Sequence, residues 1–262
     1  MPGSDFSMTK SAIQKAARNR LLGAMSARDF EHLIPRMEPV SLPFGLILEA
    51  PGKPVETIIF VEHGIASRLV VGAQGEMSES GHIGFEGMTG RSVVLGGEHA
   101  TNQIQMQVSG GGLAIRAADL LEVMRLSVDL HTLMVRYVLT TIAQGDHTLL
   151  STGQYTVAQR LARWLVMYHD RIDGDHFPVT HELLAMMLNV RRAGITTALH
   201  LIEGEHAVRS TRGTIKVLDR TALIKLAGGS YGVPEAEYER LIAPHHPEPM
   251  DPAPSQDATI LQ

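Results

Sequence analysis

Residues 179–204 read VTHELLAMMLNVRRAGITTALHLIEG and contain two amphipathic segments joined by a short turn. Thr180 is well placed to cap a first helix, because its hydroxyl can accept a hydrogen bond from an unpaired backbone N–H of the first turn. Ala185 is small where two helices must cross closely, and Asn189 tolerates the left-handed backbone of a tight turn. The inward side of the first helix is expected to consist of Leu184, Met187 and Leu188, with Val190 closing the joint.

A second helix is predicted after the turn, because apolar residues recur at the i, i+3, i+4 and i+7 positions of one face. These residues are Ile195, Ala198, Leu199 and Ile202. The other faces carry hydrogen-bonding side chains near the start of the helix, namely Arg191, Arg192, Thr196, Thr197 and His200. This arrangement is typical of a recognition helix, in which arginine can bind guanine through two hydrogen bonds in the major groove. We therefore predict that these five residues contact DNA, together with Thr180 and His181 of the first helix.

A basic hairpin is predicted directly after the two helices. Residues 207–210 and 214–217 form two short β-type runs around Thr211-Arg212-Gly213. Any helical hairpin would share the apolar periodicity, but it would not predict the Ala185 to Asn189 spacing, a double arginine and a basic hairpin in succession. The combination predicts a winged helix-turn-helix that binds double-stranded DNA. Its wing would contribute three cations, Arg209, Arg212 and Lys216.

The charge distribution agrees with a DNA-binding module. Residues 151–228 hold ten Lys or Arg and seven Asp or Glu, a net charge of +3, whereas the whole chain carries -5, so that the remainder carries -8. A positive module favours duplex binding, because neutralising phosphates releases condensed counterions. The excess is small and adds only modest support.

The composition limits the class of protein. The chain has 262 residues, 44% of them hydrophobic and 19% charged, which suffices for more than one core. It contains no cysteine, which excludes disulfides, thiolate zinc sites and cysteine-held iron–sulfur clusters. It also shows no run of eighteen apolar residues and no apolar signal segment at its start. We expect a cytoplasmic protein that has no membrane partner.

The first half of the chain reads as a β-domain. Residues 1–18 are expected to form a flexible arm, and residues 19–116 a β-roll with a helical lead-in. Short β-type runs at 57–61, 67–71 and 103–108 indicate a small antiparallel barrel or jelly roll. Turn signals are expected at Pro51-Gly52, His63-Gly64, Gln74-Gly75, Gly96-Gly97 and Gly110-Gly111-Gly112.

The region that follows the β-domain reads as helical, which makes the fold class α+β. Residues 117–150 are expected to form a short helix and a long dimerisation helix, residues 151–228 the winged domain, and residues 229–262 a partly disordered tail with a short helix at 234–242. We interpret the apolar stripe of the long helix as a homodimer interface, although it could instead only cover the chain's own β-domain. The stripe comprises Leu126, Leu130, Leu133, Met134, Tyr137, Val138 and Ile142.

The order of these parts resembles the Crp/Fnr superfamily of bacterial transcriptional regulators. The resemblance extends from about residue 21 to residue 241 and rests on residues 50–52 and 56–64, on AQRLARWL at 158–165, and on LNVRR at 188–192, a turn typical of a branch with a double arginine. It implies a cyclic-nucleotide-binding-like β-roll, a long dimer helix and a winged reader, with double-stranded DNA, a second copy and RNA polymerase as candidate partners. Ala193 replaces a base-reading glutamate common in the family, so the usual operator is not expected.

The resemblance also implies an effector pocket in the β-roll, and here the sequence departs from the family. The pocket residues matched are Gly84, Glu86, Arg91 and Ser92. Members that bind cyclic AMP have a Gly-Glu-Leu segment and an Arg-Ser pair about ten residues later, whereas here the glutamate is displaced by one position and Arg91-Ser92 follows too soon. Cyclic AMP binding of the usual kind is therefore not expected, and no cofactor is assigned, although Arg91-Ser92 could still bind the anion of another small effector.

One alternative from another class is a cupin-like, metal-dependent enzyme with histidine ligands. The β-domain contains His63, His82 and His99, but these lack the close His-x-His spacing that supplies two ligands from one strand. The one close pair of histidines, His245 and His246, lies in the Pro-rich tail. We therefore expect neither a metal site nor catalytic residues.

Overall fold

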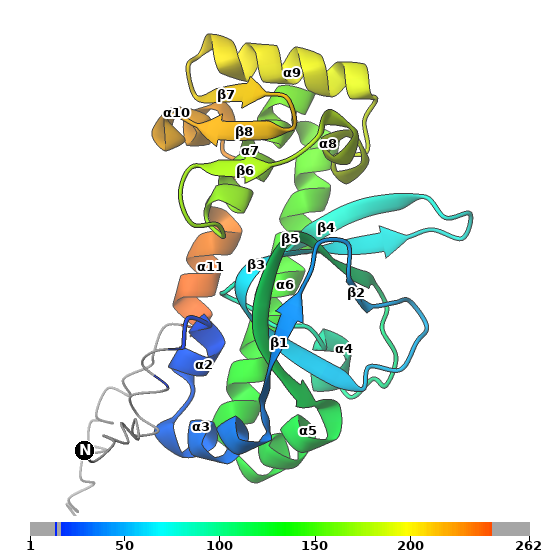
Figure 1. Cartoon of the computed structure of the whole chain (residues 1–262), viewed down its shortest axis with the longest axis vertical. Helices are drawn as coiled ribbons and strands as arrows, with labels where there is room; N and C mark the ends of the chain where they lie inside the picture. The colour runs from blue at the N-terminus through cyan, green and yellow to red at the C-terminus, as the bar shows by residue number, and fades with distance from the viewer. Residues whose placement is uncertain (1–13, 15–16, 243–262) are drawn as a thin grey trace, which may run out of the picture.

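The computed structural model describes residue 14 and residues 17–242, and it contains an antiparallel β-roll, a long central helix and a C-terminal helical domain with a small sheet (Figure 1). The expected α+β architecture is confirmed. The predicted arm before residue 14, the tail after residue 242 and the His245-His246 pair lie outside the described residues.

The β-roll is a five-stranded antiparallel sheet in which β1, β5, β3 and β4 lie in that order and β2 pairs with β5. Its strands are long because β-branched and aliphatic residues dominate them, and alternating residues such as Ile58 and Phe60 are fully buried. The strands are β1 (Glu38–Leu42), β2 (Ile47–Glu49), β3 (Thr57–Val71), β4 (Met77–Ile83) and β5 (Gln103–Arg116).

Two turns expected from glycines are instead irregularities inside long strands. His63-Gly64 lies within β3, where the register with β5 shifts, and the three glycines 110–112 lie within β5. A side chain could not be placed there, because a Cβ on Gly110 would lie 1.9 Å from the carbonyl oxygen of His63. These glycines therefore allow two bulged strands to approach closely rather than reverse the chain. The turns at Gly52, Gly75 and Gly96 have the expected positive φ angles of 73°, 86° and 84°.

Short helices close the ends of the β-roll. Asn19 and Ser26 cap the first two of them, because their side chains accept hydrogen bonds from backbone N–H groups of the first turn. Arg18, which we expected in a flexible arm, makes two hydrogen bonds of 2.6 and 2.7 Å to Asp173 and so ties this end to the C-terminal domain. The helices are α2 (Arg20–Ala24), α3 (Ala27–Leu33), the 3-10 helix η1 (Ile34–Arg36), α4 (Arg91–Val94) and α5 (Ala117–Leu126).

The long helix α6 (Val128–Gln154) runs along the β-roll, and its position corrects the predicted dimer interface. Its N-terminus is capped by Ser127, whose hydroxyl accepts a hydrogen bond from the Leu130 N–H at 3.2 Å. Four of the predicted interface residues lie in the chain's own core and are at most 3% exposed, because this side of the helix covers the β-roll; they are Leu130, Met134, Tyr137 and Val138. Leu133 also packs against that core, whereas Leu126 and Ile142 are exposed.

The C-terminal domain surrounds a three-stranded sheet with the order β6, β8, β7. Its first helix begins with a capping box, in which Thr156 and Gln159 exchange side-chain to backbone hydrogen bonds. The elements are α7 (Val157–His169), β6 (His176–Pro178), α8 (His181–Met187), α9 (Arg192–Gly204), β7 (Val208–Thr211), β8 (Thr214–Val217) and α10 (Arg220–Leu226).

A last helix, α11 (Val233–Ile242), packs along α6 rather than extending into solvent (Figure 1). The predicted short helix is thus present, in a segment that we had placed in the tail. The two domains also share a core, because Ile65 and Leu69 of β3 pack with Trp164 and Tyr168 of α7. The indole N–H of Trp164 donates to Glu79 of β4 at 2.5 Å, so the joint has both apolar and polar contacts.

Candidate nucleic-acid interface

The turn between α8 and α9 has the geometry expected from its residues. The hydroxyl of Thr180 accepts a hydrogen bond from the Leu183 N–H at 3.1 Å and caps α8. Asn189 has a φ of 50°, in the left-handed region, and the N–H of Val190 donates to Ala185 at 2.9 Å. The chain therefore reverses sharply between the two helices, because Asn accepts the left-handed conformation at low cost.

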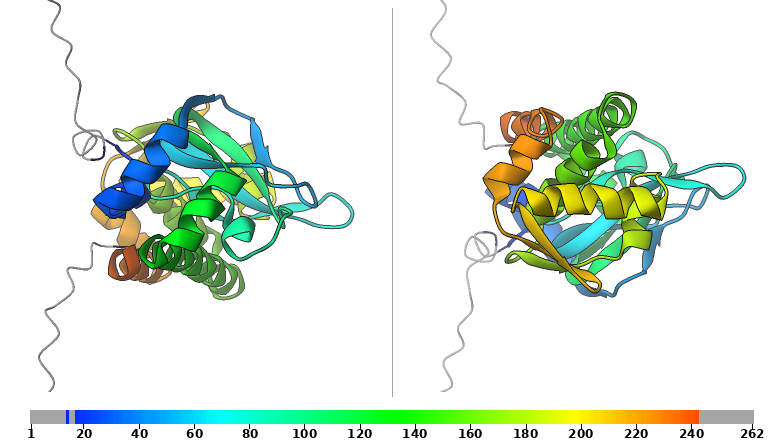
Figure 2. Two further views of the ribbon diagram at one scale, coloured as in Figure 1. Left: turned by 90° about the horizontal axis from the view of Figure 1, so that it is seen from below. Right: turned by 90° about the horizontal axis from the view of Figure 1, so that it is seen from above.

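The predicted apolar face of α9 is buried, and its polar face is open. Ile195, Ala198, Leu199 and Ile202 are at most 2% exposed and pack in the core of the C-terminal domain. The polar residues Arg191, Arg192, Thr197 and His200 are exposed, and Thr196 is half-buried. The helix lies at one end of the molecule, beside the β7–β8 hairpin and clear of the β-roll (Figures 1 and 2).

Side chains of α8 and α9 contact one another across the turn. Arg192 Nε lies 2.8 Å from Glu182 Oε1, and about two thirds of each side chain is exposed. His181 Nδ1 lies 3.1 Å from the hydroxyl of Thr196. An exposed ion pair adds little stability, roughly 0–1 kcal/mol, so Arg192 can exchange Glu182 for a phosphate or a base at small cost. This pair could not be predicted from the sequence, because the two residues are ten positions apart on different helices.

The predicted wing is present as the β7–β8 hairpin. Arg209 lies directly opposite Lys216, and Arg212 is at the exposed tip beside Gly213, whose φ is 76°. Directly opposed residues of antiparallel strands share a face, so two like charges face the same side of the hairpin. Like charges in this position are destabilising unless an anion lies between them. The hairpin is therefore suited to binding phosphate.

Arg160 is a supporting residue that we did not predict as part of the site. It extends from α7, and its guanidinium donates to the carbonyl of Leu188 at the end of α8. Burial lowers the pKa of Arg160 below its usual value. This contact satisfies one of the unpaired carbonyls at the helix C-terminus and fixes the turn relative to α7.

The four predicted effector residues do not form one pocket. Glu86 accepts a hydrogen bond of 3.2 Å from the Gly84 N–H and lies 2.7 Å from Arg171 Nε, at the junction with the C-terminal domain. Arg91 and Ser92 lie instead inside the β-roll, where Arg91 donates to Asn102 at 2.5 Å. A single pocket built from all four residues is therefore wrong.

The interior of the β-roll beside Arg91 is nearly filled. Its cavity measures about 10 Å³, enough for about one water molecule. Arg68 is 1% exposed and occupies this space, donating to the Thr141 carbonyl at 3.0 Å. Burial lowers the pKa of Arg68 to about 10. The cavity continues into an open groove of about 420 Å³ between β4 and α6, which includes Ile142 and Leu149.

The histidines considered for a metal site lie apart. His82 Nε2 is 3.0 Å from Glu79, His63 Nδ1 is 3.2 Å from Arg18, and His99 is exposed. Within residues 17–242, no three His, Cys, Asp or Glu residues are grouped so that they could hold a metal ion. In the same part of the chain, no helix combines the length and the apolar character that crossing a bilayer requires.

Comparisons with known proteins identify the domain and the fold. Residues 159–226 match the Crp-like helix-turn-helix domain. No curated protein matches the sequence. A protein described as a transcriptional regulator of the Crp/Fnr family from Eubacterium rectale has a similar structure, with a TM-score of 0.63 and 16% identity over 80% of this chain and 98% of that one.

Two further structures are similar over most of their length. FixK2 from Bradyrhizobium japonicum has a TM-score of 0.60 and 12% identity, covering 72% of this chain and 96% of that one. The c-di-GMP-responsive regulator CLP from Xanthomonas campestris has a TM-score of 0.58 and 14% identity, covering 73% and 99%. These matches are to regulators and give no support to the enzyme alternative. The chain therefore carries a Crp-like helix-turn-helix domain on the fold of the Crp/Fnr family of DNA-binding transcriptional regulators.

Proposed function

We propose that the protein regulates transcription as a homodimer that binds a pseudo-palindromic DNA site, with one α9 helix in the major groove of each half-site. The observation that carries this proposal is the division of α9 into two faces. Its apolar residues are buried, whereas Arg191, Arg192, Thr197 and His200 face solvent at one end of the molecule. A helix presented in this way fits the major groove, and two copies would lie about one helical turn of DNA apart.

We assign base contacts to α9 and backbone contacts to its surroundings. Arg191 and Arg192 stand at the start of α9, where the helix dipole adds to their attraction for DNA. Thr196, Thr197 and His200 follow on the exposed side. Thr180 and His181 would support α9 from α8, and the wing cations Arg209, Arg212 and Lys216 would bind phosphates.

The dimer contact that we propose is the outward face of α6, not the face suggested by the apolar stripe. Val128, Ile142 and Leu149 are exposed on this face, and they recur with seven-residue spacing together with Val135, which is partly buried against the chain's own core. The positions four residues after these are Thr132, Leu139, Asp146 and Gly153, of which only Leu139 is a large apolar residue, and it is exposed. β-branched residues at the first position of a seven-residue repeat favour a pair of helices over larger bundles.

The proposed dimer also accounts for the groove beside Arg68. Ile142 and Leu149 form part of that groove and belong to the proposed seam, so the helix of a second copy would cover it. Such a dimer would close the open side of the β-roll. Because its target is DNA, the protein would act in the cytoplasm of a bacterial cell.

The test uses a duplex selected from a random library by the full-length protein. The double variant Arg191→Ala, Arg192→Ala should bind this duplex at least about thirtyfold more weakly, because each lost base contact costs about 1–3 kcal/mol. Fluorescence anisotropy gives the Kd values. The matched control is Arg28→Ala with Arg125→Ala, which removes two exposed arginines far from α9 and should leave the Kd nearly unchanged. Equal affinity of the α9 variant and the original protein would refute the proposal.

A further inference from the structure

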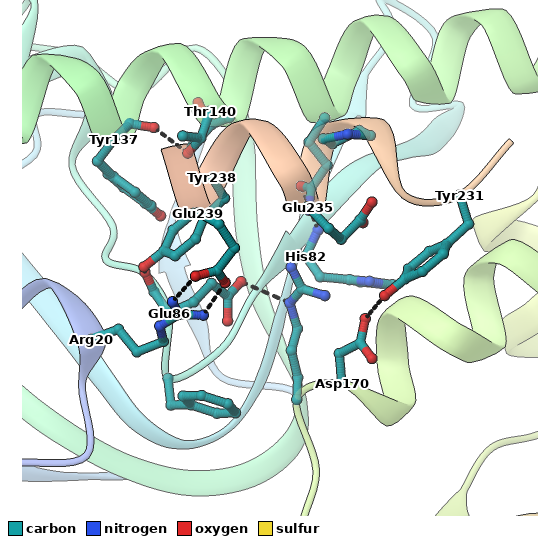
Figure 3. Close-up of a pocket in the computed structure, with 15 residues that line it drawn as sticks. Arg20, His82, Glu86, Tyr137, Thr140, Asp170, Tyr231, Glu235, Tyr238 and Glu239 are labelled. Atoms are coloured by element: carbon teal, nitrogen blue, oxygen red, sulfur yellow. Dashed lines mark hydrogen bonds and ion pairs between the residues drawn. The ribbon is translucent and has the colours of Figure 1, made fainter. Parts of the chain in front are cut away.

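A cavity of about 200 Å³ lies at the junction of the two domains, separate from the interior of the β-roll (Figure 3). Five elements contribute to it: the start of α2, the end of β4, the middle of α6, the end of α7, and α11. Phe85, Tyr137, Tyr231 and Tyr238 supply aromatic surface, and the polar lining includes Thr140 and Gln144. A concave site with apolar walls and a few polar groups is the usual form of a small-molecule site. The volume is below that of drug-sized pockets, which suits a small metabolite.

Polar contacts hold α11 over this cavity. Tyr238 donates a hydrogen bond of 2.6 Å to the carbonyl of Glu86, and Arg20 makes two hydrogen bonds of 2.7 Å to Glu239. At the other end, the hydroxyl of Tyr231 donates to Asp170 at 2.7 Å. Figure 3 shows these pairs on opposite sides of the space. The cavity wall is therefore built from fixed side chains rather than from a loose surface depression.

Most of the charged groups that line the cavity are paired. Four carboxylates and two guanidinium groups contribute to its wall. Three of the carboxylates are paired: Glu239 with Arg20, Glu86 with Arg171, and Asp170 with Arg220 from outside the cavity.

The fourth carboxylate, Glu235, makes no direct ion pair, but its charge acts on the guanidinium groups of Arg163 and Arg171. It accepts one hydrogen bond, from the Gly232 N–H at 2.9 Å, and no cationic side chain of residues 17–242 lies within ion-pair distance of it. Its acceptor capacity is largely unused, and it lies beside aromatic surface (Figure 3).

We propose that this cavity binds a small organic amine, whose ammonium group pairs with Glu235 and whose carbon atoms pack against Phe85, Tyr231 and Tyr238. An ammonium group in a partly buried site pairs most favourably with an ion of opposite charge. A phosphate or carboxylate ligand fits less well, because both guanidinium groups of the wall are already paired and the ligand's negative charge would face Glu235. This inference rests on the proposed regulatory function and supplies the chemical class of its effector.

The position of the cavity connects ligand binding to the reader domain. Arg171, at the end of α7, forms an ion pair with Glu86 of the β-roll segment. Burial alone would lower the pKa of Arg171, but the interaction with Glu86 raises this pKa above its usual value. Asp170 binds Arg220 of α10 at 2.6 Å and Tyr231 before α11. A ligand that displaces α11 or these ion pairs would change the orientation of the C-terminal domain, and with it the affinity for DNA.

The experiment measures binding of amines to the full-length protein by calorimetry and by thermal unfolding. The probes are ethanolamine, putrescine and phenylethylamine, each compared with its neutral counterpart ethylene glycol, butanediol or phenylethanol. At least one amine should raise the Tm by about 2 °C or more, and its counterpart should not. Glu235→Gln should weaken binding of that amine by about tenfold or more, because it removes a charge-assisted contact.

Two variants make the result specific to this carboxylate. Glu237→Gln, two residues along α11 and paired with Arg240, is the matched control and should keep the affinity. Glu235→Asp should retain part of it, since the charge remains. The inference is overturned if none of the three amines binds, if the neutral counterparts bind equally well, or if Glu237→Gln weakens binding as much as Glu235→Gln. The Kd for DNA without amine is measured in parallel, so that failure of amine binding with intact DNA binding would leave the proposed function standing.

Discussion

Helices α6 and α9 each bury one apolar side, and they differ in what the other side exposes. On α6, Met134 and Val138 are buried, while Leu139, Ile142 and Leu149 face solvent. On α9, the exposed side carries mainly arginine, threonine and histidine, with Leu201 as an exposed apolar residue. The buried sides of the two helices are alike, because each helix packs its apolar residues against a hydrophobic core. The exposed sides of the two helices therefore indicate their partners. An exposed apolar side indicates contact with a second protein surface, and an exposed cationic side indicates binding of a polyanion.

The largest expected effect concerns the seam of α6. Leu139→Asp combined with Ile142→Asp places charges where the two helices would pack, so the protein should become monomeric in analytical ultracentrifugation. A monomer engages one half-site at a time, and the affinity for the full DNA site should fall by about a hundredfold or more, because the second contact is no longer intramolecular. Fluorescence anisotropy on the selected duplex measures this loss.

The control for the seam variant changes two other exposed apolar residues to aspartate. Phe44 and Leu95 lie in loops of the β-roll and are 66% and 61% exposed. Phe44→Asp with Leu95→Asp should leave both the oligomeric state and DNA binding as they were. A seam variant that stays dimeric would show that the exposed side of α6 is not the contact.

A substitution on the buried side of α6 should lower the stability of the protein and leave its oligomeric state unchanged. Met134→Ala removes a fully buried side chain from the core beneath the β-roll, and it should lower the free energy of unfolding by about 2–5 kcal/mol. The mass of the assembly should not change as long as the protein is folded. Denaturant unfolding at fixed protein concentration gives the first quantity, and ultracentrifugation the second.

Exposed His131 on the same helix provides the reference for that experiment. His131→Ala should change stability by no more than about 0.5 kcal/mol, as is usual for surface substitutions. If Met134→Ala dissociated a dimer without loss of stability, the assignment of the two sides of α6 would have to be reversed.

The α8–α9 region was predictable because local rules decide it. Thr180 caps, Asn189 turns and the apolar residues of α9 recur with helical period, and none of these features depends on a distant segment. For α6 the helix itself was predictable, but its orientation was not, since the stripe around Met134 and the seven-residue repeat through Ile142 are both apolar.

The effector residues could not be predicted, because tertiary contacts decide them. Glu86 and Arg91 are five positions apart, yet one faces the domain junction and the other the interior of the β-roll. The junction cavity joins residues as distant as Glu86 and Glu235, and its last wall is a helix that the sequence placed in a tail. The turns predicted at the glycines of β3 and β5 were wrong for a similar reason, because glycine permits a turn and a close approach of two strands equally well.

The smallest expected effect concerns the wing, where Arg209 faces Lys216 across the hairpin. Arg209→Ala should lower DNA affinity by about tenfold at moderate salt and reduce the slope of log Kd against log salt by about one, since one phosphate contact is lost. Stability without DNA should stay equal or rise slightly, because a like-charge pair is removed. Arg116→Ala, whose side chain is 77% exposed on β5, is the control and should leave the salt slope unchanged. A loss of DNA affinity without a loss of stability is what distinguishes a phosphate-binding cation from one that supports the fold, and an unchanged salt slope would remove the wing from the interface.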